Sequence, residues 1–200
     1  MSALNRAGVV VVLVTLVAMT TGCSADEPST TTPVDRDRPV EAEGMTLASD
    51  AFEDGGAIAV RYANTGVQGG ENVSLPLRWS GAPAGTMTYA LVVVDRHPVA
   101  DNWVHWMVVD IPVSTLEIAE GASGGAIPAG SRELRNTFGS VGYGGPQPPP
   151  GSGDHEYEVT MYALDVAELE IAEDATLDEF LSAVDGATLE TGRISGFFGR

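Results

Sequence analysis

Four apolar segments of the chain have the composition and spacing of β-strands. They are rich in β-branched and aromatic residues and span residues 57–63, 87–95, 104–110 and 157–164. The run Leu91–Val94 has no polar alternation, which predicts a strand that is buried on both faces. Tyr157, Val159 and Met161 instead alternate with polar residues, which predicts a strand with one buried face.

One helix is predicted near the C-terminus. Thr176 and Glu179 have the spacing of a capping box, apolar residues follow at helical spacing, and Gly186 is placed to end the helix. The 24 glycines and 12 prolines gather between the apolar segments, as expected for turns that join strands. The sequence therefore predicts one mainly β domain with a short C-terminal helix.

The N-terminal residues have the pattern of a lipoprotein leader. Arg6 precedes an apolar run over residues 7–19 that is too short to span a bilayer, and the chain's single cysteine, Cys23, follows it. The segment resembles a bacterial lipobox, although Thr20 stands where leucine is usual. We expect a signal peptide at residues 1–22, a lipidated Cys23 at the start of a disordered tether over 23–44, and a folded domain over 45–200.

The charge of the chain limits its partners. There are 28 acidic and 10 basic residues, which give a net charge of −18, and every basic residue is arginine. No basic stripe is available to neutralise phosphate backbones, so nucleic acid is excluded as a partner. Attraction to anionic lipids is excluded as well, and we expect the protein to be extracytoplasmic and anchored to the bacterial cell membrane through lipid on Cys23.

The three histidines stand at strand ends or in loops. His97 follows Asp95, His105 lies within the third predicted strand segment, and His155 precedes the fourth. A Gly- and Pro-rich segment over residues 136–151 lies between the last two histidines, and such a loop can present backbone N–H groups to an anion. The sequence therefore predicts a preformed polar pocket at the strand ends.

The order of several short motifs resembles the phosphatidylethanolamine-binding protein family, in its bacterial Raf-kinase-inhibitor-like (YbhB/YbcL) branch. The motifs are Leu75-Pro-Leu-Arg-Trp79, Gly81-Ala-Pro-Ala-Gly-Thr86, Asp95, Pro98, His105-Trp106, Phe138-Gly139, Gly142-Tyr-Gly-Gly-Pro146, His155 and Tyr162-Ala-Leu-Asp165. The resemblance implies two antiparallel β-sheets and a small pocket for phosphate-like groups. The ligand-binding residues that it implies are Asp95, His97, Pro98, His105, Gly142, Tyr143, Pro146 and His155.

Three positions depart from the family's pattern. The family's second aspartate is either replaced by His97 or lost in a one-residue deletion. Glu156 stands where the family has arginine, and Gln147 where cysteine is frequent. Replacing an acid with His97 favours anions, whereas replacing an arginine with Glu156 disfavours them. The sequence leaves the net effect open.

The function predicted from these residues is non-catalytic binding of a small anionic ligand, either phosphate or a phospholipid headgroup, with no cofactor. One alternative is inhibition of a protease or kinase through protein contacts. Another is a zinc site built from the three histidines and Asp95. A serine hydrolase is rejected because the segment Phe138–Gly142 lacks the first glycine of a nucleophile elbow. Trp79, Trp106 and Phe138 are expected in the core.

Overall fold

The computed structural model describes residues 44–200, so the predicted signal peptide, Cys23 and all but the last residue of the predicted tether lie outside the described part. The elements are β1 (Thr46–Ala48), β2 (Gly56–Ala57), a 3₁₀ helix η1 (Val60–Tyr62), β3 (Leu77–Ser80), β4 (Thr88–Asp95), β5 (Trp103–Pro112), β6 (Glu117–Ile118), β7 (Arg132–Glu133), β8 (His155–Leu164), α1 (Leu177–Asp185) and β9 (Thr188–Phe198).

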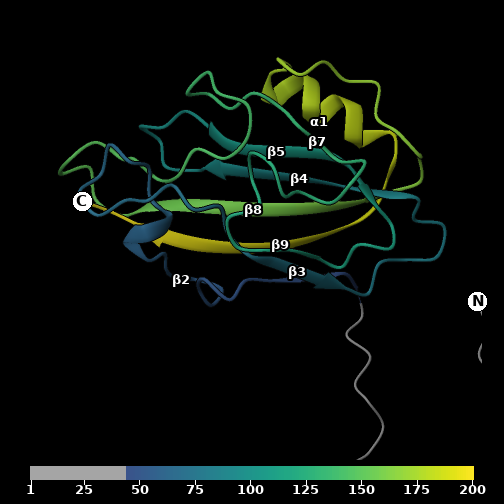
Figure 1. Cartoon of the computed structure of the whole chain (residues 1–200), viewed down its shortest axis with the longest axis horizontal. Helices are drawn as coiled ribbons and strands as arrows, with labels where there is room; N and C mark the ends of the chain where they lie inside the picture. Colours follow the sequence, from purple (N-terminus) through teal and green to yellow (C-terminus); the bar gives the residue numbers. More distant parts are fainter. Residues whose placement is uncertain (1–43) are drawn as a thin grey trace, which may run out of the picture. The chain divides into compact units, whose positions relative to one another are not determined.

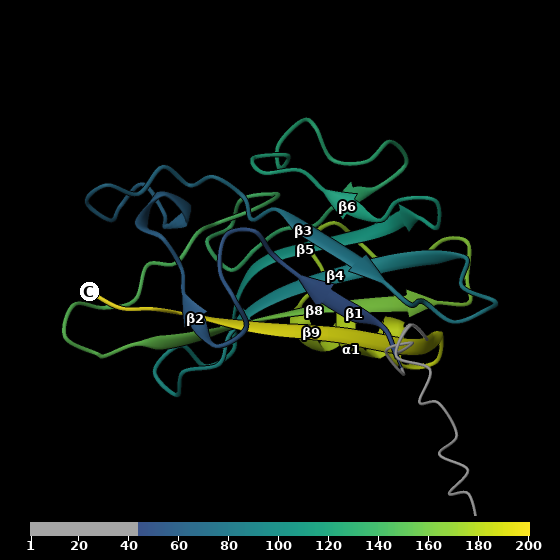
Figure 2. The same cartoon turned by 90° about the horizontal axis from the view of Figure 1, so that it is seen from below.

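The strands form two sheets. The larger has six strands in the order β2-β9-β8-β4-β5-β7, and the smaller has three in the order β1-β3-β6. All neighbouring strands are antiparallel except β2 and β9, which are parallel. Figure 2 shows β1 and β3 in front of the larger sheet, with α1 behind it. The prediction of a mainly β fold with two sheets and one short helix is confirmed.

The centre of the larger sheet is buried on both faces. Leu91 and Val93 of β4 belong to the apolar cluster between the two sheets, whereas Val92 and Val94 belong to a second cluster that α1 covers. Figure 1 shows α1 on one side of this sheet and β3 on the other. Because successive side chains of a strand point to opposite faces, a central strand covered on both sides must be apolar throughout. All eight residues of β4 are buried, as the run Leu91–Val94 predicted.

Helix α1 begins and ends where the sequence predicts. The Thr176 side chain accepts a hydrogen bond from the Glu179 backbone N–H, and the Glu179 side chain accepts one from the Thr176 backbone N–H. Phe180 and Val184 are buried against the sheet, and Gly186 caps the C-terminal end. Within residues 44–200, no helix has the length and apolar character needed to cross a membrane.

The predicted strand over residues 57–63 is wrong. Only Gly56 and Ala57 pair with β9, and the chain then turns into η1. The Tyr62 N–H donates to the Ala59 carbonyl, and the turn buries the Tyr62 ring while Val60 stays exposed. The apolar residues that suggested a strand are instead buried from a short pairing and a turn, with Ile58, Tyr62 and Ala63 all buried.

The eleven-residue strand β9 was not predicted. Gly192 and Gly196 interrupt its apolar pattern, and glycine is unfavourable inside a strand. The structure explains Gly196, because a Cβ at this position would lie 2.7 Å from Ile58 Cγ1 and 2.9 Å from Phe52 Cδ2. The small residue allows the segment around β2 to pack directly on β9.

Candidate functional site

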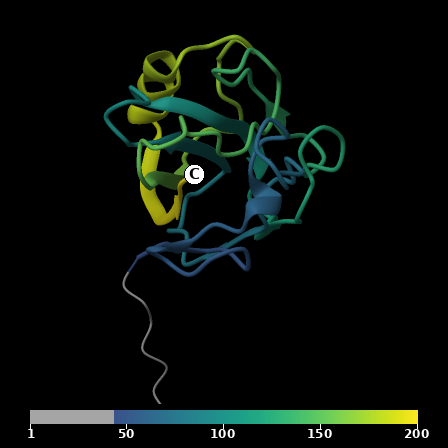
Figure 3. The ribbon, with the colours of Figure 1, turned by 90° about the vertical axis from the view of Figure 1, so that its left-hand side faces the viewer.

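The polar pocket residues meet where the central strands begin and end. Strand β4 lies between β5 and β8, and its last residue, Asp95, pairs with Trp103 of β5 and Tyr157 of β8. His155 precedes Tyr157 by two residues, so both side chains point to the face of the sheet that carries Asp95. Figure 3 views the domain from this end, where the chain also finishes.

A β-bulge places His105 on the same face. Val93 pairs with Trp106 and Val94 pairs with Val104, so that His105 has no partner on β4. Such an extra residue redirects the side chains beside it. The bulge lets His105 and the core residue Trp106, which are adjacent in sequence, both lie on the side of the sheet that faces β3.

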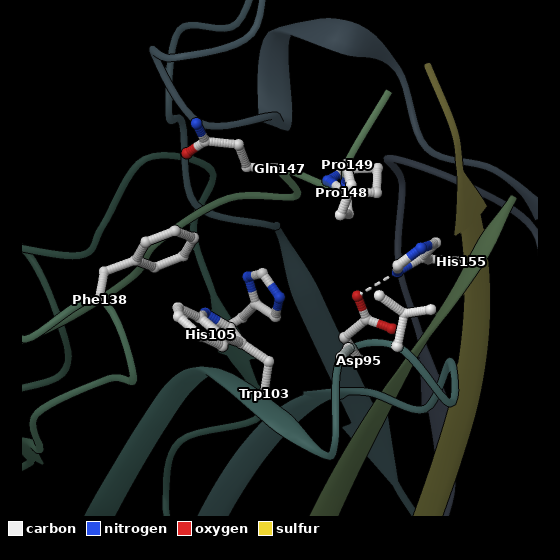
Figure 4. A pocket seen from close by; sticks show the side chains of 10 residues that line it. Asp95, Trp103, His105, Phe138, Gln147, Pro148, Pro149 and His155 are labelled. Atoms are coloured by element: carbon white, nitrogen blue, oxygen red, sulfur yellow. Dashed lines mark hydrogen bonds and ion pairs between the residues drawn. The ribbon is translucent and has the colours of Figure 1, made fainter. Parts of the chain in front are cut away.

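These residues line a cavity of about 230 Å³. Its walls are mainly apolar, and Figure 4 shows the His105 ring between Phe138 and Asp95, with the proline loop above it. The lining residues are Asp95, Val99, Ala100, Trp103, His105, Phe138, Gln147, Pro148, Pro149 and His155. The cavity therefore combines a small polar group of side chains with an aromatic and proline-rich surround.

Asp95 and His155 form a buried ion pair. Asp95 is 3% exposed and His155 is 1% exposed, and Asp95 Oδ2 lies 2.6 Å from His155 Nδ1. Asp95 Oδ1 accepts from the His97 backbone N–H at 2.9 Å. The His97 ring stacks on the His155 ring with 3.8 Å between centroids. His97 therefore covers and orients the pair, although it does not line the cavity itself.

The second nitrogen of His155 contacts a serine. His155 Nε2 lies 2.9 Å from Ser152 Oγ, and this hydroxyl donates to the Pro149 carbonyl at 2.7 Å. Because its proton is directed at Pro149, Ser152 Oγ is placed to accept a hydrogen bond from His155 Nε2. The order Asp95, His155, Ser152 resembles a catalytic triad, but Ser152 lies outside the cavity lining and its hydroxyl does not point its proton at the histidine.

His105 is held in one neutral tautomer. Its Nδ1 lies 2.5 Å from the Gly144 carbonyl oxygen, so Nδ1 carries the proton and donates. The side chain is buried, and burial lowers the pKa of His105 to about 4, partly offset by the bond to Gly144. Among residues 44–200 no group is hydrogen-bonded to Nε2, which is therefore a free acceptor at neutral pH.

The loop over residues 142–146 lies behind the cavity. Tyr143 donates its hydroxyl to the Tyr62 carbonyl and packs on Trp106, and the Pro146 carbonyl accepts from Asn64. The predicted pocket residues Gly142, Tyr143 and Pro146 therefore do not line the cavity. Their contribution is indirect, because this loop supplies the Gly144 carbonyl that fixes His105.

Several lining residues were not predicted. Phe138, which was expected in the core, is 38% exposed and forms one wall of the cavity, so that expectation is wrong. A Cβ at Gly144 would lie 2.6 Å from Phe138 Cδ2, so the glycine permits the ring to lie across the loop. Trp79 and Trp106 are buried in the core as expected. The predicted residue Pro98 is exposed and lies outside the lining, whereas Val99 and Ala100 beside it are part of it.

Neither arginine nor lysine lines the cavity. Glu156, the residue in place of the family's arginine, accepts a hydrogen bond from Ser195 Oγ at 2.7 Å and also lies outside the lining. Gln147 contributes an amide to the wall. Arg200 donates through Nε to the Pro148 carbonyl at 2.5 Å, which ties the C-terminus to the proline loop. Within residues 44–200 no cluster of three or more His, Cys, Asp or Glu side chains is arranged to hold a metal ion.

Known proteins are similar to this chain in sequence. The family model described as "Phosphatidylethanolamine-binding protein" matches residues 48–199. The protein named "Putative lipoprotein LppC" of Mycobacterium tuberculosis is 39% identical over 168 residues, which are 84% of this chain and 79% of that protein. UPF0098 protein YbhB of Escherichia coli is 35% identical over 136 residues, which are 66% of this chain and 85% of that protein.

The fold agrees with these sequence matches. The crystal structure of Escherichia coli YbcL, described as a new member of the mammalian PEBP family, superimposes with a TM-score of 0.73 and 27% identity. The match covers 78% of this chain and 98% of that chain. Because the family model spans most of the chain and the domain superimposes on a solved member, this chain belongs to the phosphatidylethanolamine-binding protein family.

Proposed function

We propose that the domain is a non-catalytic binding protein that holds a small anionic ligand, phosphate or a phospholipid headgroup, in the cavity around Asp95, His105 and His155. The observation that carries the proposal is the placement of these three buried polar side chains in one cavity with otherwise mainly apolar walls. Burying polar groups is costly unless they are paired, so a site that keeps His105 Nε2 free favours a ligand that pairs with it.

The cavity fits a headgroup better than a larger molecule. Its volume of about 230 Å³ is below the ~300–1,000 Å³ of drug-sized ligand pockets. Polar contacts to the ligand are available from the Gln147 amide and from His105. Trp103 and Phe138 offer apolar surface to the carbon atoms of an ester or a glycerol unit. No arginine lines the cavity, so shape and hydrogen bonds decide affinity.

The N-terminal segment supports a location at the membrane. Cys23 and the predicted tether lie outside the described residues, and the proposal of a lipid anchor rests on the leader pattern and on the relative named as a lipoprotein. We infer that lipid on Cys23 holds the domain on the extracytoplasmic side of the cell membrane. The ligand site would then stand close to a source of phospholipid headgroups.

An NMR titration tests the binding proposal. The Cys23→Ser chain, which cannot be lipidated, is titrated with inorganic phosphate, phosphoethanolamine and zinc while the ring signals of the three histidines are followed. We expect saturable shifts of His105 and His155 with phosphate and phosphoethanolamine, and loss of these shifts in His105→Ala. A response to zinc alone would instead support the metal alternative. If none of the three probes shifts the histidine signals, anion binding is contradicted and the inhibitor role is favoured.

A further inference from the structure

Two of the polar side chains that line the cavity, His105 and Asp95, present hydrogen-bond acceptors, whereas the lining residues Trp103 and Gln147 contain donors. His105 Nε2 is an acceptor because Nδ1 donates to Gly144. The carboxylate of Asp95 also only accepts, and its two oxygens have lone pairs beyond those used by His97 N–H and His155 Nδ1. Both ring nitrogens of His155 already have partners, in Asp95 and Ser152.

These acceptors disfavour an anion that carries no proton. An oxygen without hydrogen that approaches His105 Nε2 places lone pair against lone pair, so no hydrogen bond forms at that contact. An oxygen that carries a proton can donate to Nε2. If that proton moves to the His105 ring, the imidazolium donates a charge-assisted hydrogen bond to the ligand oxygen. In both cases the proton comes from the ligand.

We propose that the pocket selects ligands that carry a proton on the group placed against His105 and Asp95, such as the P–OH of a phosphate or the N–H of an ammonium headgroup, and discriminates against sulfate. The inference rests on the proposed function and narrows its ligand class. Sulfate has nearly the size and shape of phosphate but carries no proton. At about pH 8 phosphate is mainly a dianion like sulfate and still has one P–OH, so the two anions then separate proton donation from shape and charge.

Calorimetric titration of the Cys23→Ser chain with inorganic phosphate and with sulfate, at equal ionic strength and about pH 8, tests the inference. We expect phosphate to bind at least about tenfold more tightly than sulfate, because phosphate can donate its proton to His105 Nε2 and sulfate cannot. Equal affinities would overturn the proton requirement but leave the anion site intact. Binding of neither anion would overturn the proposed function together with this inference.

Two variants assign the effect to His105. In His105→Gln the side-chain amide can turn an N–H toward the ligand, so the ratio of phosphate to sulfate affinity should fall toward one. Val99→Ala is the matched control, since Val99 lines the same cavity without a polar group, and its ratio should stay as in the parent chain. An unchanged ratio in a folded His105→Gln protein would contradict the role of His105. The ring signals of His97 and His155 report whether the variant is folded.

Phosphoethanolamine and phosphocholine distinguish the two sources of the proton. At about pH 8 both phosphate monoesters are largely dianionic, because their second pKa is about 6. Only phosphoethanolamine then has a donor, its ammonium N–H. Tighter binding of phosphoethanolamine than of phosphocholine is expected if the ammonium serves as the donor. If both esters bind as tightly as inorganic phosphate, no ligand proton is required and the inference is overturned.

Discussion

The protonation state of His105 is set by its immediate neighbours. The Gly144 carbonyl fixes the proton on Nδ1, and the aromatic rings of Phe138 and Tyr157 pack edge-on against the buried imidazole. Burial penalises the charged form of a histidine, which is why its pKa falls. The same burial that makes His105 a neutral acceptor for a ligand also makes the folded state sensitive to acid.

The pH dependence of stability should show this. Burial lowers the pKa of folded His105 from 6.5 to about 4. Between these values the unfolded chain binds a proton that the folded chain does not, so stability falls as the pH is lowered from about 6.5 to 4. The loss from this group should be roughly 3 kcal/mol. Guanidinium unfolding of the parent chain and of His105→Gln at several pH values measures it, and parallel curves for the two proteins would contradict it.

The buried pair of Asp95 and His155 should matter far more than surface pairs. Asp95→Ala leaves His155 buried without its partner, and the free energy of unfolding should fall by about 3 kcal/mol. Glu173→Ala is the control, because its ion pair with Arg135 is solvent-exposed and should be worth less than about 1 kcal/mol. Chemical denaturation measures the free energy of unfolding of both variants. Similar losses would show that the buried pair stabilises the fold no more than the exposed pair.

The polar residues of the site could be predicted, whereas its apolar walls could not. Asp95, His105 and His155 stand out because few residue types donate and accept protons, and the motif order points to them. Phe138 and Trp103 gave no such signal, since an aromatic residue in a sequence is more often core than cavity wall. Only the contact between Gly144 and Phe138 reveals why that ring lies across the loop at the cavity edge.

At the scale of elements, the bulge in β5 and the glycine loop behind it act together. The bulge frees His105 from pairing with β4, and the loop then supplies two hydrogen bonds, from His105 Nδ1 to the Gly144 carbonyl and from the Gly144 N–H to the His105 carbonyl. The loop can approach because Gly145 lies directly against the backbone of the segment around η1. The position of the histidine therefore depends on a close contact between backbones.

A methyl group in that contact should disturb both fold and site. A Cβ at Gly145 would lie 2.1 Å from the Tyr62 carbonyl oxygen, a backbone atom that cannot rotate away. We expect Gly145→Ala to lower the free energy of unfolding by about 3 kcal/mol and to shift the His105 ring signal. Gly125→Ala, whose Cβ would meet nothing within 4 Å, is the control and should be nearly neutral. Thermal unfolding with NMR distinguishes the two, and equal stability would refute the contact.

The elements themselves were predictable to different degrees. The central strands and α1 were found because burial on two faces and a capping box leave strong local patterns, as in Leu91–Val94 and at Thr176. Strand β9 and η1 were missed because their form depends on distant partners. Gly196 faces Ile58, and Tyr62 is drawn inward by the core and by Glu120, which accepts from its hydroxyl at 2.7 Å. Local propensity contains no information on such contacts.

At the scale of the whole molecule, charge and proposed attachment have to be reconciled. A net charge of −18 repels anionic lipid surfaces, so electrostatics cannot hold this protein at a membrane. Acyl chains can, because each buried CH₂ contributes ~0.8 kcal/mol and two or more chains give stable binding. Attachment through lipid would therefore not depend on the charge of the domain.

This view predicts how the protein should partition. The full chain expressed in a bacterium should sediment with membranes, stay there in about 1 M salt and be released by a non-ionic detergent, because a lipid anchor does not depend on charge. Cys23→Ser should move the protein to the soluble fraction, whereas Ser24→Ala, a neighbouring control, should not. The lining residues of the cavity all lie within residues 44–200, so the Cys23→Ser chain should keep the ligand affinity of the parent chain. Membrane retention of Cys23→Ser, or release of the parent chain by salt alone, would contradict the anchor.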